Sequence, residues 1–111
     1  MATTDTQSID EIIAEMTRRI VERFDPLQVI LFGSHAREDA HADSDVDLLV
    51  VFPRIDDNRQ MRVDIRGALS DLPVAKDIVV ATPDDISRSR DRLGSILRPA
   101  VREGRTLYQH G

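Results

Sequence analysis

The chain has 111 residues, no cysteine, 41% hydrophobic and 32% charged residues, and a formal net charge of −5 at pH 7. This length predicts a single domain over residues 1–111 with one modest core, and the lack of cysteine excludes disulfides and thiol chemistry. The acidic balance argues against direct nucleic-acid binding, while the lack of a long apolar run or a signal-peptide pattern argues against a membrane location and favours the cytoplasm.

The first predicted element is an amphipathic helix, preceded by a polar stretch, residues 1–7, that we expect to be disordered. Ser8 and Glu11 have the spacing of a capping box, and apolar residues then recur at helical spacing as far as Phe24. Asp25-Pro26 ends the helix, because proline disfavours a helical residue before it. Three arginines are expected on its outer side: Arg18, Arg19 and Arg23.

A predicted strand from Gln28 to Phe32 leads into a glycine–serine turn. Gly33 permits a sharp turn and a close approach of a ligand to the main chain. Residues 34–39 could open a short helix, and the backbone N–H groups of a strand-to-helix turn suit phosphate oxygens. Ser34 adds a hydroxyl donor and Arg37 a fixed cation. Taken alone, the Gly-Ser pair favours an ordinary strand–turn–helix connection.

Two carboxylates, Asp45 and Asp47, open the next predicted strand, which continues as an apolar run from Leu48 to Phe52. Residues two apart in a strand project from the same face. Two ionised carboxylates about 4 Å apart repel by about 4 kcal/mol at an effective dielectric near 20. A bound divalent cation removes that repulsion. An isolated Asp-x-Asp, in contrast, usually marks a solvated strand end.

A third acidic residue supports the hypothesis of a divalent-cation site. A helix from about Asn58 to Asp71 precedes a strand from Pro73 to Thr82, in which Asp77 stands at the start of the apolar core. If the second and third strands are neighbours, the three carboxylates converge. Oxygen ligands without cysteine suit Mg²⁺, with Mn²⁺ as the alternative. Three acids at one edge are what a two-metal phosphoryl or nucleotidyl transfer site requires.

The rest of the chain predicts one more helical segment and a short strand. Pro83-Asp84-Asp85 is a helix-start signal, and a sparse apolar stripe follows as far as Arg102. Gly104 stops the helix, and Thr106 to Tyr108 add an edge strand in which Tyr108 is expected to be a packing residue. This order of elements predicts an α/β (α+β) fold, a small mixed sheet with helices mainly on one face and an open active edge.

The central motif resembles that of a known family. Gly33-Ser34, ten residues and then Asp45-x-Asp47 resemble the signature of the DNA polymerase beta-like nucleotidyltransferase superfamily. The runs G-S-x-A-R and S-D-x-D-L-L-V look like its minimal nucleotidyltransferase (MNT) family, as does a closing G-x-x-L-Y. The resemblance implies a polymerase beta-like nucleotidyltransferase core in which Gly33 and Ser34 hold the triphosphate. The nucleotide is expected to contact Arg37 and Ser44 as well, and two Mg²⁺ would be held by Asp45, Asp47 and Asp77.

The same resemblance implies a function and a partner. Many MNT proteins are antitoxins paired with HEPN-domain ribonucleases, so the chain would transfer AMP from ATP to a tyrosine hydroxyl of such a toxin within a hetero-oligomer. ATP follows from the resemblance alone, because nothing in the residues selects adenine. The alternatives are an antitoxin that blocks the toxin only by binding, and a nucleotidyltransferase that acts on a small molecule. Two departures from the family pattern, His35 and Glu38, leave the detailed phosphate contacts open.

Overall fold

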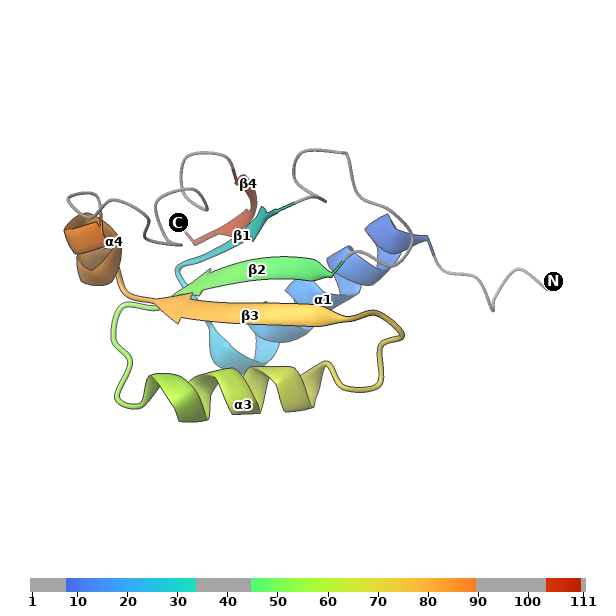
Figure 1. Cartoon of the computed structure of the whole chain (residues 1–111), viewed down its shortest axis with the longest axis horizontal. Helices are drawn as coiled ribbons and strands as arrows, with labels where there is room; N and C mark the ends of the chain where they lie inside the picture. The colour runs from blue at the N-terminus through green and yellow to red at the C-terminus, as the bar shows by residue number, and fades with distance from the viewer. Residues whose placement is uncertain (1–7, 34–44, 90–103, 111) are drawn as a thin grey trace, which may run out of the picture.

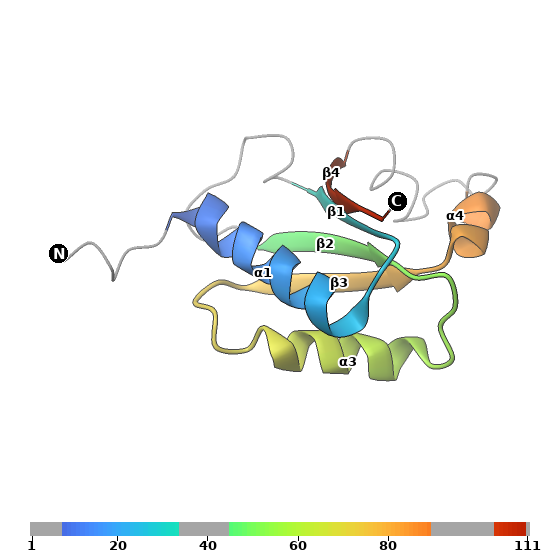
Figure 2. The ribbon, with the colours of Figure 1, turned by 180° about the vertical axis from the view of Figure 1, so that it is seen from behind.

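The computed structural model describes residues 8–33, 45–89 and 104–110. A four-stranded mixed sheet, with the order β3-β2-β1-β4, carries two of the described helices on one face (Figures 1 and 2). The elements in chain order are α1 (Ile9–Phe24), β1 (Gln28–Phe32), β2 (Val46–Val51), α3 (Asn58–Ala68), β3 (Lys76–Ala81), α4 (Pro83–Ser89) and β4 (Arg105–Gln109). The predicted fold class is therefore confirmed. Among these helices, none is long and apolar enough to cross a membrane.

Helix α1 begins and ends where the sequence predicts. The Ser8 hydroxyl accepts a hydrogen bond from the backbone N–H of Glu11 at 3.2 Å, and Glu11 Oε1 accepts one from the backbone N–H of Ser8 at 2.9 Å. This is the predicted capping box. At the other end Asp25 adopts a left-handed conformation with φ of 52°, and its N–H donates to Val21 O. The buried Pro26 follows and prevents continuation of the helix.

The larger core lies between the sheet and the layer formed by α1 and α3. Alternate side chains of β2 face this layer and are fully buried: Val46, Leu48 and Val50. They pack in one cluster with Ile20 of α1 and Ile65 of α3. Because the side chains of a strand alternate between its two faces, Asp47 projects from the opposite face of β2.

That opposite face carries a smaller apolar cluster. Leu49 and Val51 of β2 are buried there together with Ala81 of β3, and Ile86 of α4 packs against them. Figure 1 shows α4 at the end of the sheet where β2 and β3 finish. Asp47 and Asp77 stand near the first residues of β2 and β3, at the other end of the sheet from α4.

Several boundaries differ from the predictions. β3 covers Lys76–Ala81 rather than Pro73 to Thr82, and β2 covers Val46–Val51 rather than Asp45 to Phe52. Helix α3 ends at Ala68 rather than Asp71, because the N–H of Leu69 turns back to Arg66 O at 3.1 Å and closes a tighter turn. The predicted edge strand is present but longer, and β4 pairs with β1 across a register shift between Val29 and Ile30. The short helix expected at 34–39 and the later part of the last predicted helix, residues 90–102, lie outside the described residues.

The sequence predicts Arg19 on the outer side of α1. In the structure it instead joins α1 to the end of α3. Its Nη1 donates to Asp71 Oδ1 at 2.6 Å and to Ala68 O at 3.1 Å, and its Nε donates to Glu15 Oε2 at 2.8 Å. The side chain is only 19% exposed. The helical period alone could not show this position, because it depends on α1 and α3 packing beside each other on one sheet face.

Glu15 gives the fold a measurable dependence on pH. Hydrogen bonds from Arg18 and then Arg19 lower the pKa of Glu15 from 4.5 to about 2. Because this pKa is lower in the folded state than in the unfolded state, the carboxylate stabilises the fold above pH 4.5, and the contribution is lost as the pH falls from 4.5 toward 2. We expect the midpoint of urea unfolding to fall less across this window in Glu15→Gln than in the wild type. Equal falls in both proteins would contradict the assignment.

Candidate active site

Two of the predicted site residues lie side by side on adjacent strands. β2 and β3 are parallel, and their register pairs Asp47 with Asp77. Paired residues of neighbouring strands project from the same face of a sheet, with the strands about 4.8 Å apart. Asp47 is half-buried and Asp77 is exposed. The second and third predicted strands are therefore neighbours, which was the condition for bringing these carboxylates together.

Asp45 is placed differently. It precedes β2, which begins at Val46, and it is exposed. Within residues 8–33, 45–89 and 104–110, no group of three acidic or histidine side chains is close enough together to hold a metal ion. The strand register thus pairs Asp47 with Asp77, and the role of Asp45 as a third ligand stays a prediction. The strand ladder fixes the backbones of that pair only, and like charges favour separation of the side chains.

Gly33 brings the turn after β1 directly against the Asp47 carboxylate. The antiparallel register of β1 and β2 pairs Phe32 with Asp47, which places the next residue beside that side chain. Gly33 has φ of 75°, in the left-handed region that glycine adopts without steric cost. A Cβ built at this residue would overlap Asp47 Oδ2 and lie 3.2 Å from its Cγ. A residue with a side chain could not bring the main chain so close to the carboxylate.

Phe32 is a neighbour of the site that sequence patterns do not identify. It is half-buried, packs against the smaller apolar cluster and stands opposite Asp47 in the ladder. An aromatic residue at the end of an apolar run looks like an ordinary core residue, so only the register of β1 and β2 reveals its position. Lys76 precedes Asp77 in β3 but is bonded elsewhere: it is half-buried and its Nζ donates to Leu72 O at 3.4 Å.

Three further predicted nucleotide-binding residues, Ser34, Arg37 and Ser44, lie outside the described residues, as does His35. Their roles stay predictions. Tyr108 packs against the larger core, as expected for a packing residue.

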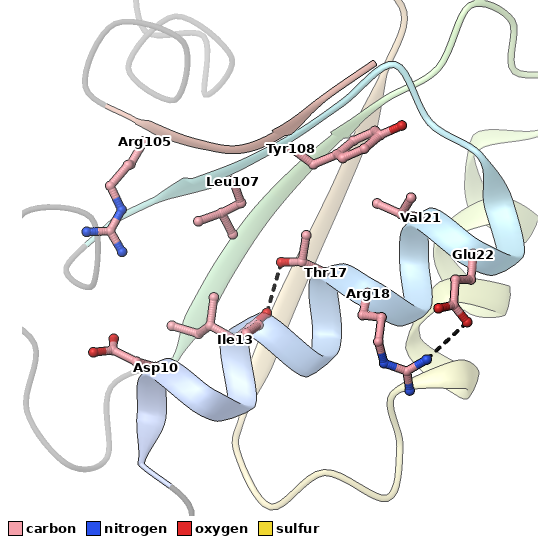
Figure 3. Close-up of a pocket in the computed structure, with 10 residues that line it drawn as sticks. Asp10, Ile13, Thr17, Arg18, Val21, Glu22, Arg105, Leu107 and Tyr108 are labelled. Atoms are coloured by element: carbon pink, nitrogen blue, oxygen red, sulfur yellow. Dashed lines mark hydrogen bonds and ion pairs between the residues drawn. The ribbon is translucent and has the colours of Figure 1, made fainter. Parts of the chain in front are cut away.

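A groove of about 580 Å³ lies between α1 and β4. Figure 3 shows Ile13, Val21, Leu107 and Tyr108 among its lining residues. Because α1 covers the face of the sheet opposite Asp47, this groove is separate from the carboxylate pair.

Known proteins resemble this chain at the level of family and fold. Residues 13–102 match a family model described as a nucleotidyltransferase domain. The protein adenylyltransferase MntA of Thermococcus cleftensis is 38% identical over 55 residues, which are 50% of this chain and 56% of that protein. The chain therefore spans little more than half the length of this relative.

Two solved structures share the fold. A Sulfolobus solfataricus protein classed as a nucleotidyltransferase has a TM-score of 0.60 and 23% identity, over 89% of this chain and 78% of that one. A chain from a mutant of the toxin–antitoxin pair MntA-HpeT has a TM-score of 0.61 and 22% identity, over 86% of this chain and 72% of that one. At such identities the likeness concerns the fold alone.

Proposed function

The chain belongs to the nucleotidyltransferase domain family, and from this membership we propose that it is an antitoxin that transfers AMP from ATP to a tyrosine hydroxyl of a HEPN-domain toxin. The observation that carries the proposal is the pairing of Asp47 with Asp77 beneath the Gly33 turn. The partial match to a protein adenylyltransferase supports AMP as the transferred group and a protein as the acceptor.

The donor set fits divalent cations. Carboxylate oxygens are the ligands that Mg²⁺ prefers, and Asp47 and Asp77 present them on one face of the sheet. In this proposal both residues, together with Asp45, would hold two Mg²⁺, with Mn²⁺ as the alternative. When bound, the ions would polarise the α-phosphate and neutralise charge on the leaving group.

The remaining chemistry rests on residues of the chain. The tyrosine oxygen would attack the α-phosphorus, the bond to the β-phosphate oxygen would break, and pyrophosphate would leave with that electron pair. Asp77, the more exposed carboxylate, would accept the phenolic proton. Gly33, which has no side chain, would let the phosphates approach the main chain next to Asp47.

One observation favours a second candidate. The three carboxylates do not form one cluster in the described part of the chain. The second candidate is therefore an antitoxin that neutralises its toxin by binding alone. In that case substitution of the carboxylates would leave neutralisation unchanged.

The test is intact mass spectrometry of the HEPN-domain toxin after incubation with this protein, Mg²⁺ and each of the four nucleoside triphosphates in turn. We expect a gain of one or more AMP units with ATP, and no gain with the Asp45→Asn/Asp47→Asn double variant. A toxin that stays unmodified while its ribonuclease activity is suppressed would replace the transferase with the binding antitoxin. An increase in toxin mass with another nucleoside triphosphate would replace ATP as the proposed substrate.

A further inference from the structure

The exposed side of α3 carries an unusual concentration of positive charge. Arg59, Arg62 and Arg66 are spaced at i, i+3 and i+7, so they lie along one stripe of the helix, and all three are exposed. Val63 is the neighbour of Arg59 at i+4 and of Arg66 at i−3, and it is 55% exposed. These four residues are called the α3 arginine face below. Figures 1 and 2 show α3 at the outer margin of the helical layer.

Among the described residues, the charges of this face form no ion pair. In the part of the chain that the structure describes, no carboxylate lies within 4.0 Å of the guanidinium groups of Arg59, Arg62 or Arg66. Two exposed arginines on other helices are ion-paired, because Arg18 pairs with Glu15 and Glu22, and Arg88 pairs with Asp85 at 2.9 Å. The three guanidinium groups of α3 are therefore available to an external carboxylate.

The arrangement also works against the helix that carries it. Arg59 and Arg62 are like charges at i, i+3, and Arg62 and Arg66 are like charges at i, i+4, which weakens an isolated helix. Arg59 stands in the first turn, where the helix dipole disfavours a cation, and α3 has no acidic residue in that turn. Folding alone therefore does not explain why the stripe is basic.

We propose that the α3 arginine face binds an acidic helix of a partner protein. Arg59 and Arg66 are seven residues apart, about 10 Å along the axis at 1.5 Å per residue. Acidic residues at i, i+3 or i+4, and i+7 of a second helix repeat over the same length. Val63 supplies an apolar contact within the charged stripe, and arginine is enriched at protein interfaces.

The same surroundings disfavour a nucleic acid as the occupant. Asp64, which accepts a hydrogen bond from Gln60 Nε2 at 2.8 Å, follows Val63 and borders the face with negative charge. The whole chain carries a net charge of −5, which repels an extended polyanion. A short helix with a few carboxylates is repelled less by this net charge than a long polyanion is. Because α3 packs on the sheet face opposite Asp47, the proposal stands independently of the transferase function.

The test uses fluorescence anisotropy with a labelled, end-capped helical peptide whose glutamates flank a leucine at the spacing above. A scrambled peptide of the same composition and a single-stranded oligouridylate serve as the other two probes. The variant is Arg59→Gln/Arg62→Gln/Arg66→Gln. Its matched control is Arg23→Gln/Arg88→Gln/Arg105→Gln, which removes the same charge from three exposed arginines on α1, α4 and β4.

We expect the patterned peptide to bind the wild type and the control alike. We expect its affinity to fall about tenfold or more in the α3 variant, because the charges that complement the glutamates are lost. Val63→Ala is expected to weaken binding by a smaller factor. The melting temperature of the α3 variant should be unchanged or higher, since repulsion within the helix is removed. Equal binding by the α3 variant, an equal loss in the control, equal binding of the scrambled peptide, tighter binding of the oligouridylate, or no binding would each overturn the proposal.

Discussion

Replacing Asp47 by asparagine is expected to lower AMP transfer by about 10³-fold or more while the chain stays folded. The change removes one negative charge and keeps the shape of the side chain beside Gly33. Stabilisation of transition-state charge by bound metal ions contributes several kcal/mol, and each 1.4 kcal/mol corresponds to a factor of ten in rate. Asp77→Asn should act in the same direction, because Asp77 is the partner of Asp47 in the ladder.

The measurement is the initial rate of AMP incorporation into the toxin, with circular dichroism to check the fold. Asp56→Asn is the matched control, because this exposed carboxylate lies in the connection between β2 and α3, outside the site. It should transfer AMP at the wild-type rate. Full activity of Asp47→Asn would remove Asp47 from the catalytic machinery, even with the family membership of the chain unchanged.

Replacing Gly33 by alanine is expected to lower both stability and transfer. A residue with a Cβ in the left-handed region costs about 1–2 kcal/mol, and Gly33 has φ of 75°. The added Cβ would also overlap Asp47 Oδ2, so that either the turn or the carboxylate must move. A misplacement of about 1 Å at a reacting centre can lower the rate about 10²-fold. We therefore expect the rate to fall more than stability alone would explain.

Gly67 provides the opposite control. It lies in α3, and a Cβ built there meets no atom within 4 Å. Glycine within a helix is about 0.5–1 kcal/mol less stable than alanine, so Gly67→Ala should raise the free energy of unfolding and leave transfer unchanged. Urea unfolding of the two variants, together with their transfer rates, gives the comparison. If Gly33→Ala behaved like Gly67→Ala, the close contact between the turn and Asp47 would have no functional meaning.

Local patterns predict most of the fold because local interactions fix most of its boundaries. The capping pair Ser8 and Glu11 and the Asp25-Pro26 stop depend on neighbours within four residues, and both are found as predicted. The end of α3 and the position of Arg19 depend instead on how two helices pack on a shared sheet. Hydrophobic periodicity carries no information about which helix lies next to which, so these two features could not be predicted.

The site shows the same division. The Asp-x-Asp pattern and the acid opening the third strand can be read from the sequence, but the register that sets Asp47 against Asp77 is a property of the assembled sheet. The contact between Gly33 and Asp47 likewise needs the pairing of β1 with β2. A glycine at a strand end indicates only a turn. The contact of this turn with a carboxylate arises because β2 places Asp47 beside Gly33.

The position of β4 at an edge of the sheet affects which strands unfold locally and exchange their amide protons. Thr106 pairs with Ile30 across most of the length of the chain, whereas only residues 33–45 separate β1 from β2. The side chains of β4 are exposed or half-buried, while those of β2 are almost all buried. Contacts distant in sequence form late, and edges with little buried area exchange their amide protons through local opening. Asp47 therefore sits on β2, an interior strand whose amides exchange only in large openings. The β4 edge is separated from β2 by β1, so it can fray and close again without disturbing Asp47.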